Sequence, residues 1–301
     1  MEQTSTRSRA DLYREISDHI IEQIEAGTGS YRMPWHHDGL PTNRPMNAIS
    51  HAPYRGINVF ILWAAAQRTN YPTGLWATYR QWHDVGIPVR AGERGTLAVF
   101  WKKLRAPAPP CMEDDATSGP LFVARRFWLF NAEQVEGYIA PRLPRLDERR
   151  RIAEAEQFIR HLEIETRFGG NNACYVPAGD YVRMPPFHQF RNAVAFYAVH
   201  LHECAHATGA PHRLDRGLAA RFGSEAYAME EMIAEWASCL ACMSLELSSE
   251  PRPDHAPYIA SWLKVLKEDR RAVFTAASQA QRIVDWMWSR QPIAMPADDV
   301  R

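Results

Sequence analysis

The segment His202-Glu203-Cys204-Ala205-His206 carries side chains that could hold a metal ion on a predicted helix. Imidazoles four residues apart lie on one face of a helix, where both can reach the same cation. Glu203 is rotated by about 100° from His202, so its carboxylate can hydrogen-bond a water at the metal without binding the ion. This H-E-x-x-H pattern predicts a mononuclear zinc-type metallopeptidase site.

The residues around this segment favour a helix that ends soon after it. Val194, Tyr197, Leu201 and Ala205 form an apolar stripe at helical spacing, and Gly209 can stop the helix. Taken alone, the five-residue pattern also occurs by chance, as two surface histidines and a helical glutamate. The assignment therefore depends on a third ligand elsewhere in the chain.

Two segments compete to supply that third ligand. His212 completes H-E-x-x-H-x-x-G-x-x-H, the metzincin pattern, but the nearest later methionines lie in a predicted helix rather than in a turn. Glu231 and Glu235 lie four residues apart on one face of that helix. In the gluzincin arrangement, one such glutamate binds the metal and an acidic residue one turn later orients a ligand histidine. We prefer Glu231 as ligand and Glu235 as orienting group, and expect Glu230 to face solvent.

The elements that must position these residues mix helices with strands, which predicts an α+β fold. Helical spacing predicts helices at 8–26, 58–68, 78–85, 147–162, 224–245 and 258–288, besides the one described above. Alternation predicts strands at 95–103 and 121–130, and two short strands around a turn within 173–185.

The length of 301 residues suggests two domains. The segment 140–146 contains two prolines and suits a linker between them. Residues 106–120 are rich in proline, acidic and small residues, which favours a disordered hairpin tip or insert.

The chain has the composition of a soluble globular protein, and we expect it to act in the cytoplasm. It contains no apolar run of about 18 residues, which excludes a membrane-spanning helix, and its polar N-terminus lacks the features of a secretory signal. The five cysteines are irregularly spaced, so no disulfide framework is expected. We interpret Cys239 and Cys242 as small core residues rather than as a redox pair or half of a zinc site.

The N-terminal part carries a positive charge that the neutral whole-chain balance hides. Between Tyr31 and Arg105 there are ten basic and three acidic residues, with nine tyrosines and tryptophans among them. Basic groups neutralise phosphates, and aromatic faces stack unpaired bases at about 1–3 kcal/mol per base. Any single tryptophan is better interpreted as core, but the region as a whole predicts nucleic-acid binding. The contact candidates, in or beside loops, are Trp35, Arg44, Tyr54, Arg55 and Asn58.

Several motifs together resemble the ArdC-type antirestriction proteins of conjugative plasmids and related mobile elements. The C-terminal motifs are H-E-x-x-H-x-T-G, R-L-D-R and R-F-G-S-E-A-Y-A-x-E-E-x-x-A-E. The N-terminal motifs are Pro-Trp at 34–35, Pro-Met-Asn at 45–47, Tyr-Arg-Gly-Ile-Asn at 54–58, Trp-Ala-Thr-Tyr at 76–79 and Phe-Asn-Ala-Glu-Gln at 130–134. The resemblance covers nearly the whole chain, except 106–120 and the extreme termini.

The resemblance implies a single-stranded-DNA-binding domain at 1–140, a linker at 141–150 and a zincin-like metallopeptidase domain at 151–301. It also implies protection of incoming plasmid DNA in the recipient cell. The metal ligands would be His202, His206 and a glutamate of the E-E-x-x-A-E segment. His212 is not part of the family's motif.

Two functions remain open. In the first, a zinc ion (or manganese or cobalt) supports peptide hydrolysis with Glu203 as proton carrier, and Tyr227 or His212 stabilises the oxyanion. The substrate would be a protein near single-stranded DNA, bound along an edge strand at 173–175. In the second, the protein coats entering single strands as a shield, and the metal site is structural or vestigial.

Overall fold

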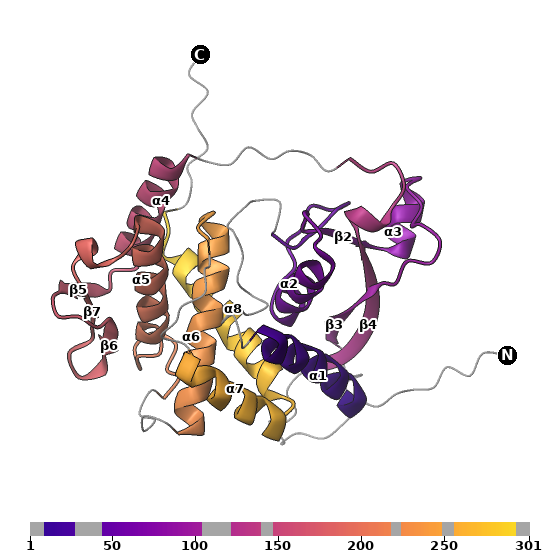
Figure 1. Cartoon of the computed structure of the whole chain (residues 1–301). Helices are drawn as coiled ribbons and strands as arrows, with labels where there is room; N and C mark the ends of the chain where they lie inside the picture. Colours follow the sequence, from indigo (N-terminus) through magenta and orange to yellow (C-terminus); the bar gives the residue numbers. More distant parts are fainter. Residues whose placement is uncertain are drawn as a thin grey trace, which may run out of the picture.

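The computed structural model describes residues 9–27, 44–103, 122–139, 147–217, 224–248 and 256–292. In these ranges the protein is α+β, as expected, with one sheet in the N-terminal part and another in the C-terminal part (Figure 1). Trp35, the segment 106–120 and the segment 140–146 lie outside the described residues. Helix α4 begins at Glu148, within the predicted linker 141–150. Among the described helices, none combines the length and apolar character needed to span a membrane.

The N-terminal part places helices around a four-stranded sheet with the order β1-β2-β4-β3. Its elements are α1 (Arg9–Gly27), β1 (Met46–Asn47), α2 (Ile57–Thr69), β2 (Leu75–Thr78), α3 (Tyr79–Asp84), β3 (Thr96–Lys103) and β4 (Phe122–Asn131). Strands β3 and β4 pair antiparallel along their length, and β2 pairs antiparallel with the other edge of β4. A capping box between Thr78 and Gln81 starts α3 directly after β2.

The tryptophans at the centre of this part belong to its core. Trp76 and Trp82 are fully buried, and Trp63 is nearly so. The indole N–H of Trp82 donates to the carbonyl of Phe130 at 3.0 Å, which satisfies its polar group inside the core. These aromatics hold the sheet together, so base stacking must be sought on other aromatic residues.

Over its described residues, the C-terminal part combines five helices with a three-stranded sheet of order β5-β7-β6. Its elements are α4 (Glu148–His161), β5 (Glu165–Phe168), β6 (Cys174–Val176), β7 (Tyr181–Met184), α5 (Ala193–Ala207), α6 (Glu225–Ser244), α7 (Ala256–Glu268) and α8 (Ala272–Ser289). Strand β5 pairs parallel with β7, and β6 pairs antiparallel with it. Helix α5 packs between this sheet and α6 (Figure 1).

The prediction of one helix over 258–288 was wrong, because α7 ends at Glu268 and α8 begins at Ala272. The carboxylate of Asp269 accepts a hydrogen bond of 2.8 Å from the backbone N–H of Arg271. Such a local bond gives the backbone an alternative to the helical ladder. Strand β5 was not predicted, because its mostly exposed sequence ETRF lacks the alternation of a half-buried strand.

The two parts pack tightly against each other. Helix α1 lies beside α7, and α2 contacts α8 (Figure 1). The ring of Phe60 on α2 stacks on Trp236 of α6 with 4.1 Å between centroids. Nη2 of Arg55, just before α2, donates to both carboxylate oxygens of Asp285 on α8, at 2.6 and 2.7 Å. One hydrophobic cluster therefore runs from α1 and α2 into the helices that carry the candidate site.

Candidate active site

Helices α5 and α6 are built so that their inward faces meet. The side chain of Asn192 caps α5 by accepting from the backbone N–H of Ala195 at 2.7 Å, and Ser224 caps α6 in the same way. The two helices pack along much of their length. His202 and His206 lie one turn apart on α5 and face Glu231 on α6, which brings the three predicted ligands together.

The distances within this group suit a single metal ion. The Nε2 atoms of His202 and His206 lie 3.2 Å apart. The Glu231 carboxylate lies 3.5 Å from Nε2 of His202 and 3.6 Å from Nε2 of His206. Tetrahedral zinc with bonds of about 2.0–2.1 Å separates its ligand atoms by roughly 3.3–3.4 Å. Both imidazoles point the same nitrogen at the carboxylate, so the donor set fits a divalent ion.

The other ring nitrogens of the two histidines also face carboxylates. Nδ1 of His202 lies 3.5 Å from Glu235, the residue predicted to orient a histidine. Nδ1 of His206 lies 3.2 Å from Glu230. The expectation that Glu230 faces solvent was therefore wrong. Arg216 draws this carboxylate inward with a bond of 2.7 Å, and the Glu230 side chain is only 16% exposed.

The contacts between histidines and carboxylates shift the pKa values of His206 and Glu231. Burial alone would lower the pKa of His206, but its hydrogen bonds to Glu230 and Glu231 outweigh burial and raise that pKa to about 10. Burial likewise opposes ionisation of Glu231, yet the two histidines hold its pKa well below the usual range. This surplus of negative charge around two imidazoles favours a cation.

Glu203 lies on the same helix, at the boundary between α5 and the small sheet. Its carboxylate accepts a hydrogen bond of 2.9 Å from the backbone N–H of Tyr175. Tyr175 is in β6, which forms one edge of the sheet. An edge strand was expected at 173–175, and β6 spans Cys174–Val176. The edge strand therefore fixes the position of the Glu203 carboxylate.

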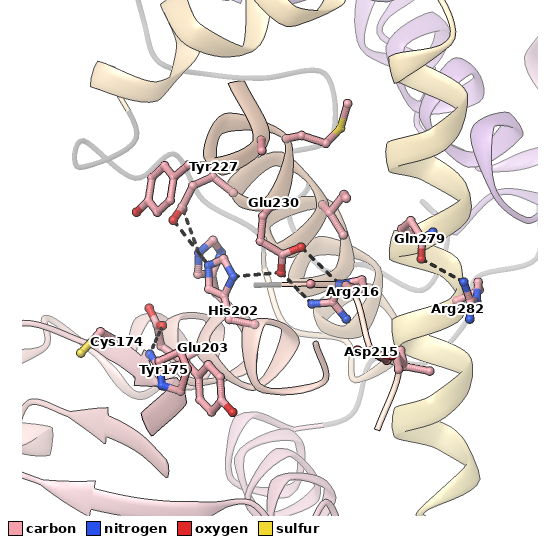
Figure 2. Close-up of a pocket in the computed structure, with 18 of the residues that line it drawn as sticks. Cys174, Tyr175, His202, Glu203, Asp215, Arg216, Tyr227, Glu230, Gln279 and Arg282 are labelled. Atoms are coloured by element: carbon pink, nitrogen blue, oxygen red, sulfur yellow. Dashed lines mark hydrogen bonds and ion pairs between the residues drawn. The ribbon is translucent and has the colours of Figure 1, made fainter. Parts of the chain in front are cut away.

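These groups open into one cavity of about 660 Å³. Figure 2 shows His202 and Glu230 in its wall, with Glu203 and Tyr175 on one side and Gln279 and Arg282 of α8 on the other. Tyr227, one of the two predicted oxyanion donors, also lines this cavity. A space of this size suits a segment of peptide or another medium-sized substrate.

His212, the competing third ligand, lies apart from the donor group. Its Nε2 is 3.2 Å from a carboxylate oxygen of Asp180, and its side chain is 60% exposed. Asp180 also accepts two bonds from Arg213 and one from the Tyr175 hydroxyl, so it belongs to a polar cluster beside the sheet. The described geometry therefore supports the glutamate arrangement rather than the metzincin one.

Several of the predicted DNA contacts make hydrogen bonds or ion pairs within the protein. The amide of Asn58 bonds both the N–H and the carbonyl of Val99, at 2.9 and 2.7 Å. The hydroxyl of Tyr54 donates to the carbonyl of Trp76. Arg55 pairs with Asp285, whereas burial and then the charge of Arg55 lower the pKa of Arg44.

Glu230 and Arg216 are the site residues that the sequence reasoning missed. Arg216 belongs to the R-L-D-R motif, which was noted only as part of a resemblance. A basic residue close after H-E-x-x-H was the available signal, because a buried carboxylate near two histidines needs a charged partner.

Helix α5 with its H-E-x-x-H segment, the following acidic helix α6 and the adjacent mixed sheet are the parts expected of a zincin-like metallopeptidase domain. A family model described as a zincin-like metallopeptidase matches residues 153–279, and one described as the N-terminal domain of anti-restriction factor ArdC matches residues 10–130. The chain belongs to the ArdC family of antirestriction proteins.

The relatives agree with this membership. The metal-free crystal structure of antirestriction protein ArdC from plasmid R388 is 34% identical, with a TM-score of 0.76 over 93% of this chain and 97% of that one. Its Mn(II)-bound structure is 33% identical, with a TM-score of 0.74 and the same coverage. An uncharacterised protein of Sinorhizobium fredii, y4eC, is 52% identical over 93% of this chain and 92% of its own length. DNA primase TraC of Escherichia coli is 35% identical, and the match covers 92% of this chain but 27% of the primase.

Proposed function

We propose that this protein binds single-stranded DNA through its N-terminal domain and cleaves a protein near that DNA at a metal site between α5 and α6. Cleavage would protect incoming plasmid DNA in the cytoplasm of the recipient cell. The observation that carries the catalytic half of the proposal is the close approach of His202, His206 and Glu231, within 4.8 Å of one another.

The donor chemistry supports a catalytic rather than a structural ion. Two imidazoles and one carboxylate are a ligand set that zinc accepts, and manganese or cobalt also binds such groups. Structural zinc sites usually have four protein ligands, whereas catalytic sites have three and leave a position for water. Within the described residues, three side chains form the candidate ligand set, and the exposed His212 is not one of them.

In the proposed reaction, each side chain has a separate task. A divalent ion bound here would act as a Lewis acid that polarises the peptide carbonyl and acidifies a water. Glu203 takes the proton of the attacking water and delivers it to the leaving amine. Its bond to the N–H of Tyr175 keeps the carboxylate oriented until substrate enters. Tyr227 is the better-placed oxyanion donor, because it lines the cavity.

For the DNA half of the proposal, exposed aromatics in the N-terminal sheet offer stacking faces. Phe100 and Phe127 are 56% and 38% exposed, and their rings meet edge to face at 5.9 Å. The register pairs Phe100 with the exposed Arg125, so these three residues share one face of the β3–β4 pair. Aromatic rings with a neighbouring arginine suit unpaired bases and their phosphates. We add these residues to Arg44 and Arg55 as candidate contacts.

Replacing Glu203 tests the peptidase half against a non-catalytic DNA shield. We expect Glu203→Ala to abolish protection of transferred plasmid DNA while metal binding, DNA binding and folding persist. Glu225→Ala is the matched control, because Glu225 lies on the exposed start of α6 and pairs with Lys264 at the surface. Full protection of plasmid DNA by Glu203→Ala would contradict the proposal that peptide cleavage protects it, and would favour the non-catalytic DNA shield.

A further inference from the structure

His206 has a largely buried carboxylate beside its ring, that of Glu230, which the proposed ligand set does not use. Oε1 of Glu230 lies 3.2 Å from Nδ1 of His206. The other ring nitrogen, Nε2, faces His202 and Glu231. An N–H on Nδ1 that donates to Glu230 leaves the lone pair on Nε2 for a metal ion.

Arg216 holds Glu230 from the opposite side. Its Nη2 donates to Oε1 of Glu230 at 2.7 Å, and its Nε donates to Oε2 at 3.2 Å. This two-pronged geometry fixes the plane of the carboxylate, which a single point charge would not do. The Arg216 side chain is only 5% exposed, so water competes little for the pair.

The same guanidinium is also bonded to the end of α5. Its Nη1 donates to the hydroxyl of Thr208 at 2.6 Å, and its Nη2 donates to the carbonyl of Ala205 at 2.8 Å. Arg216 therefore links the last turn of α5 to α6 through Glu230, as Figure 2 shows for the Arg216–Glu230 contact. The three proposed ligands come from these two helices, so this link fixes the separation of their donor atoms.

We propose that Glu230 and Arg216 are positioning residues of the metal centre. Glu230 sets the tautomer and ring orientation of His206, and Arg216 fixes Glu230 against the end of α5. Glu235 has the corresponding place beside Nδ1 of His202. The inference rests on the proposed metal site and extends it to two residues that do not bind the ion.

Metal titration of Glu230→Gln tests the inference. Mn2+ binding is followed by loss of the free-ion electron paramagnetic resonance signal, and Zn2+ binding by competition with a chromophoric chelator. We expect about 10–100-fold weaker binding, the usual effect of losing a partner of a ligand histidine. Glu225→Gln, on the exposed start of the same helix, should bind like the wild type. Wild-type affinity in Glu230→Gln would overturn the inference, whereas a wild type that binds neither ion would overturn the metal site itself.

A double variant separates positioning from folding. Glu230→Gln alone leaves the buried Arg216 charge without its carboxylate, which destabilises the protein. Glu230→Gln with Arg216→Gln removes both charges, so thermal stability measured with chelator should recover while metal affinity stays low. The visible absorption bands of bound Co2+ should also shift in both Glu230 variants and not in Glu225→Gln. Recovery of wild-type affinity and spectrum in the double variant would assign the pair a purely structural role.

Discussion

The carboxylate of Glu203 accepts a 2.9 Å hydrogen bond from the backbone N–H of Tyr175, which joins the metal-ligand helix to the edge strand β6. A proline at this position has no N–H to donate, so it removes the contact and leaves the Glu203 side chain itself unchanged. The contact gives a way to disturb Glu203 without changing it.

Tyr175→Pro should reduce activity while leaving the metal ligands intact. Without its anchor, the Glu203 carboxylate loses its orientation, and a displacement of about 1 Å can cost up to about 100-fold in rate. Plasmid protection in the recipient cell and Mn2+ affinity would be measured together. Tyr175→Phe is the control, because it removes only the hydroxyl bond to Asp180 and keeps the N–H. An equal loss of plasmid protection in both variants would show that the hydrogen bond from the Tyr175 backbone does not control activity.

His200 should make the metal-free protein less stable as the pH falls from about 6.5 to about 4. Burial lowers the pKa of His200 to about 4, whereas an unfolded histidine titrates near 6.5. Between these values the unfolded chain binds a proton that the folded chain excludes, so unfolding is favoured at low pH. The full difference amounts to about 3 kcal/mol.

Denaturant unfolding in chelator at pH 7.5 and at pH 4.5 would measure this effect. His200→Gln should show a smaller loss of stability between the two pH values than the wild type. His188→Gln, at an exposed position, should behave like the wild type. An unchanged pH dependence in His200→Gln would contradict the assignment of the effect to His200.

Removing Phe100 and Phe127 together should weaken single-stranded-DNA binding. Each lost base stack is worth about 1–3 kcal/mol, so loss of two stacks should weaken binding of an oligonucleotide at least about 30-fold in the double alanine variant. Phe168→Ala is the control, since Phe168 is 64% exposed but lies on β5 of the other domain. Fluorescence anisotropy at fixed salt compares the three proteins. Equal affinity in all of them would place the DNA surface elsewhere.

The helix that carries His202 and His206 could be predicted from sequence because the signals that define it lie close together in the chain. His202 and His206 are one turn apart, and capping and apolar spacing define α5 without reference to other elements. The choice of Glu231 as a candidate ligand rested only on its four-residue spacing from Glu235 on a second helix. The pairing of α5 with α6 then brings these side chains together.

The partners of Glu230 could not be predicted in that way. Helical geometry places Glu230 about 100° from Glu231, which suggests solvent when α6 is considered alone. The tertiary contact with Arg216, fourteen residues earlier, turns this carboxylate inward. For the same reason, the sequence could not show that the amide of Asn58, a candidate DNA contact, bonds the backbone of Val99 across the α2–β3 contact.

Divalent metal should stabilise the folded protein, and His206 should be required for this effect. A ligand present at about 100 times its dissociation constant adds about 2.7 kcal/mol to the free energy of unfolding. Thermal unfolding with Mn2+ or Zn2+, compared with chelator, would measure the increase. His206→Ala should lose the metal-dependent increase, whereas the exposed-site variant His188→Ala should retain it. Stabilisation that persists in His206→Ala would indicate binding at another place.

The most direct test is a crystal structure of the metal-soaked protein, with anomalous scattering used to locate the ion. The account predicts one ion bonded to Nε2 of His202, Nε2 of His206 and the carboxylate of Glu231, with Glu203 facing it but not bound. An ion held by His212 in place of Glu231, or by four protein ligands, would contradict the catalytic site.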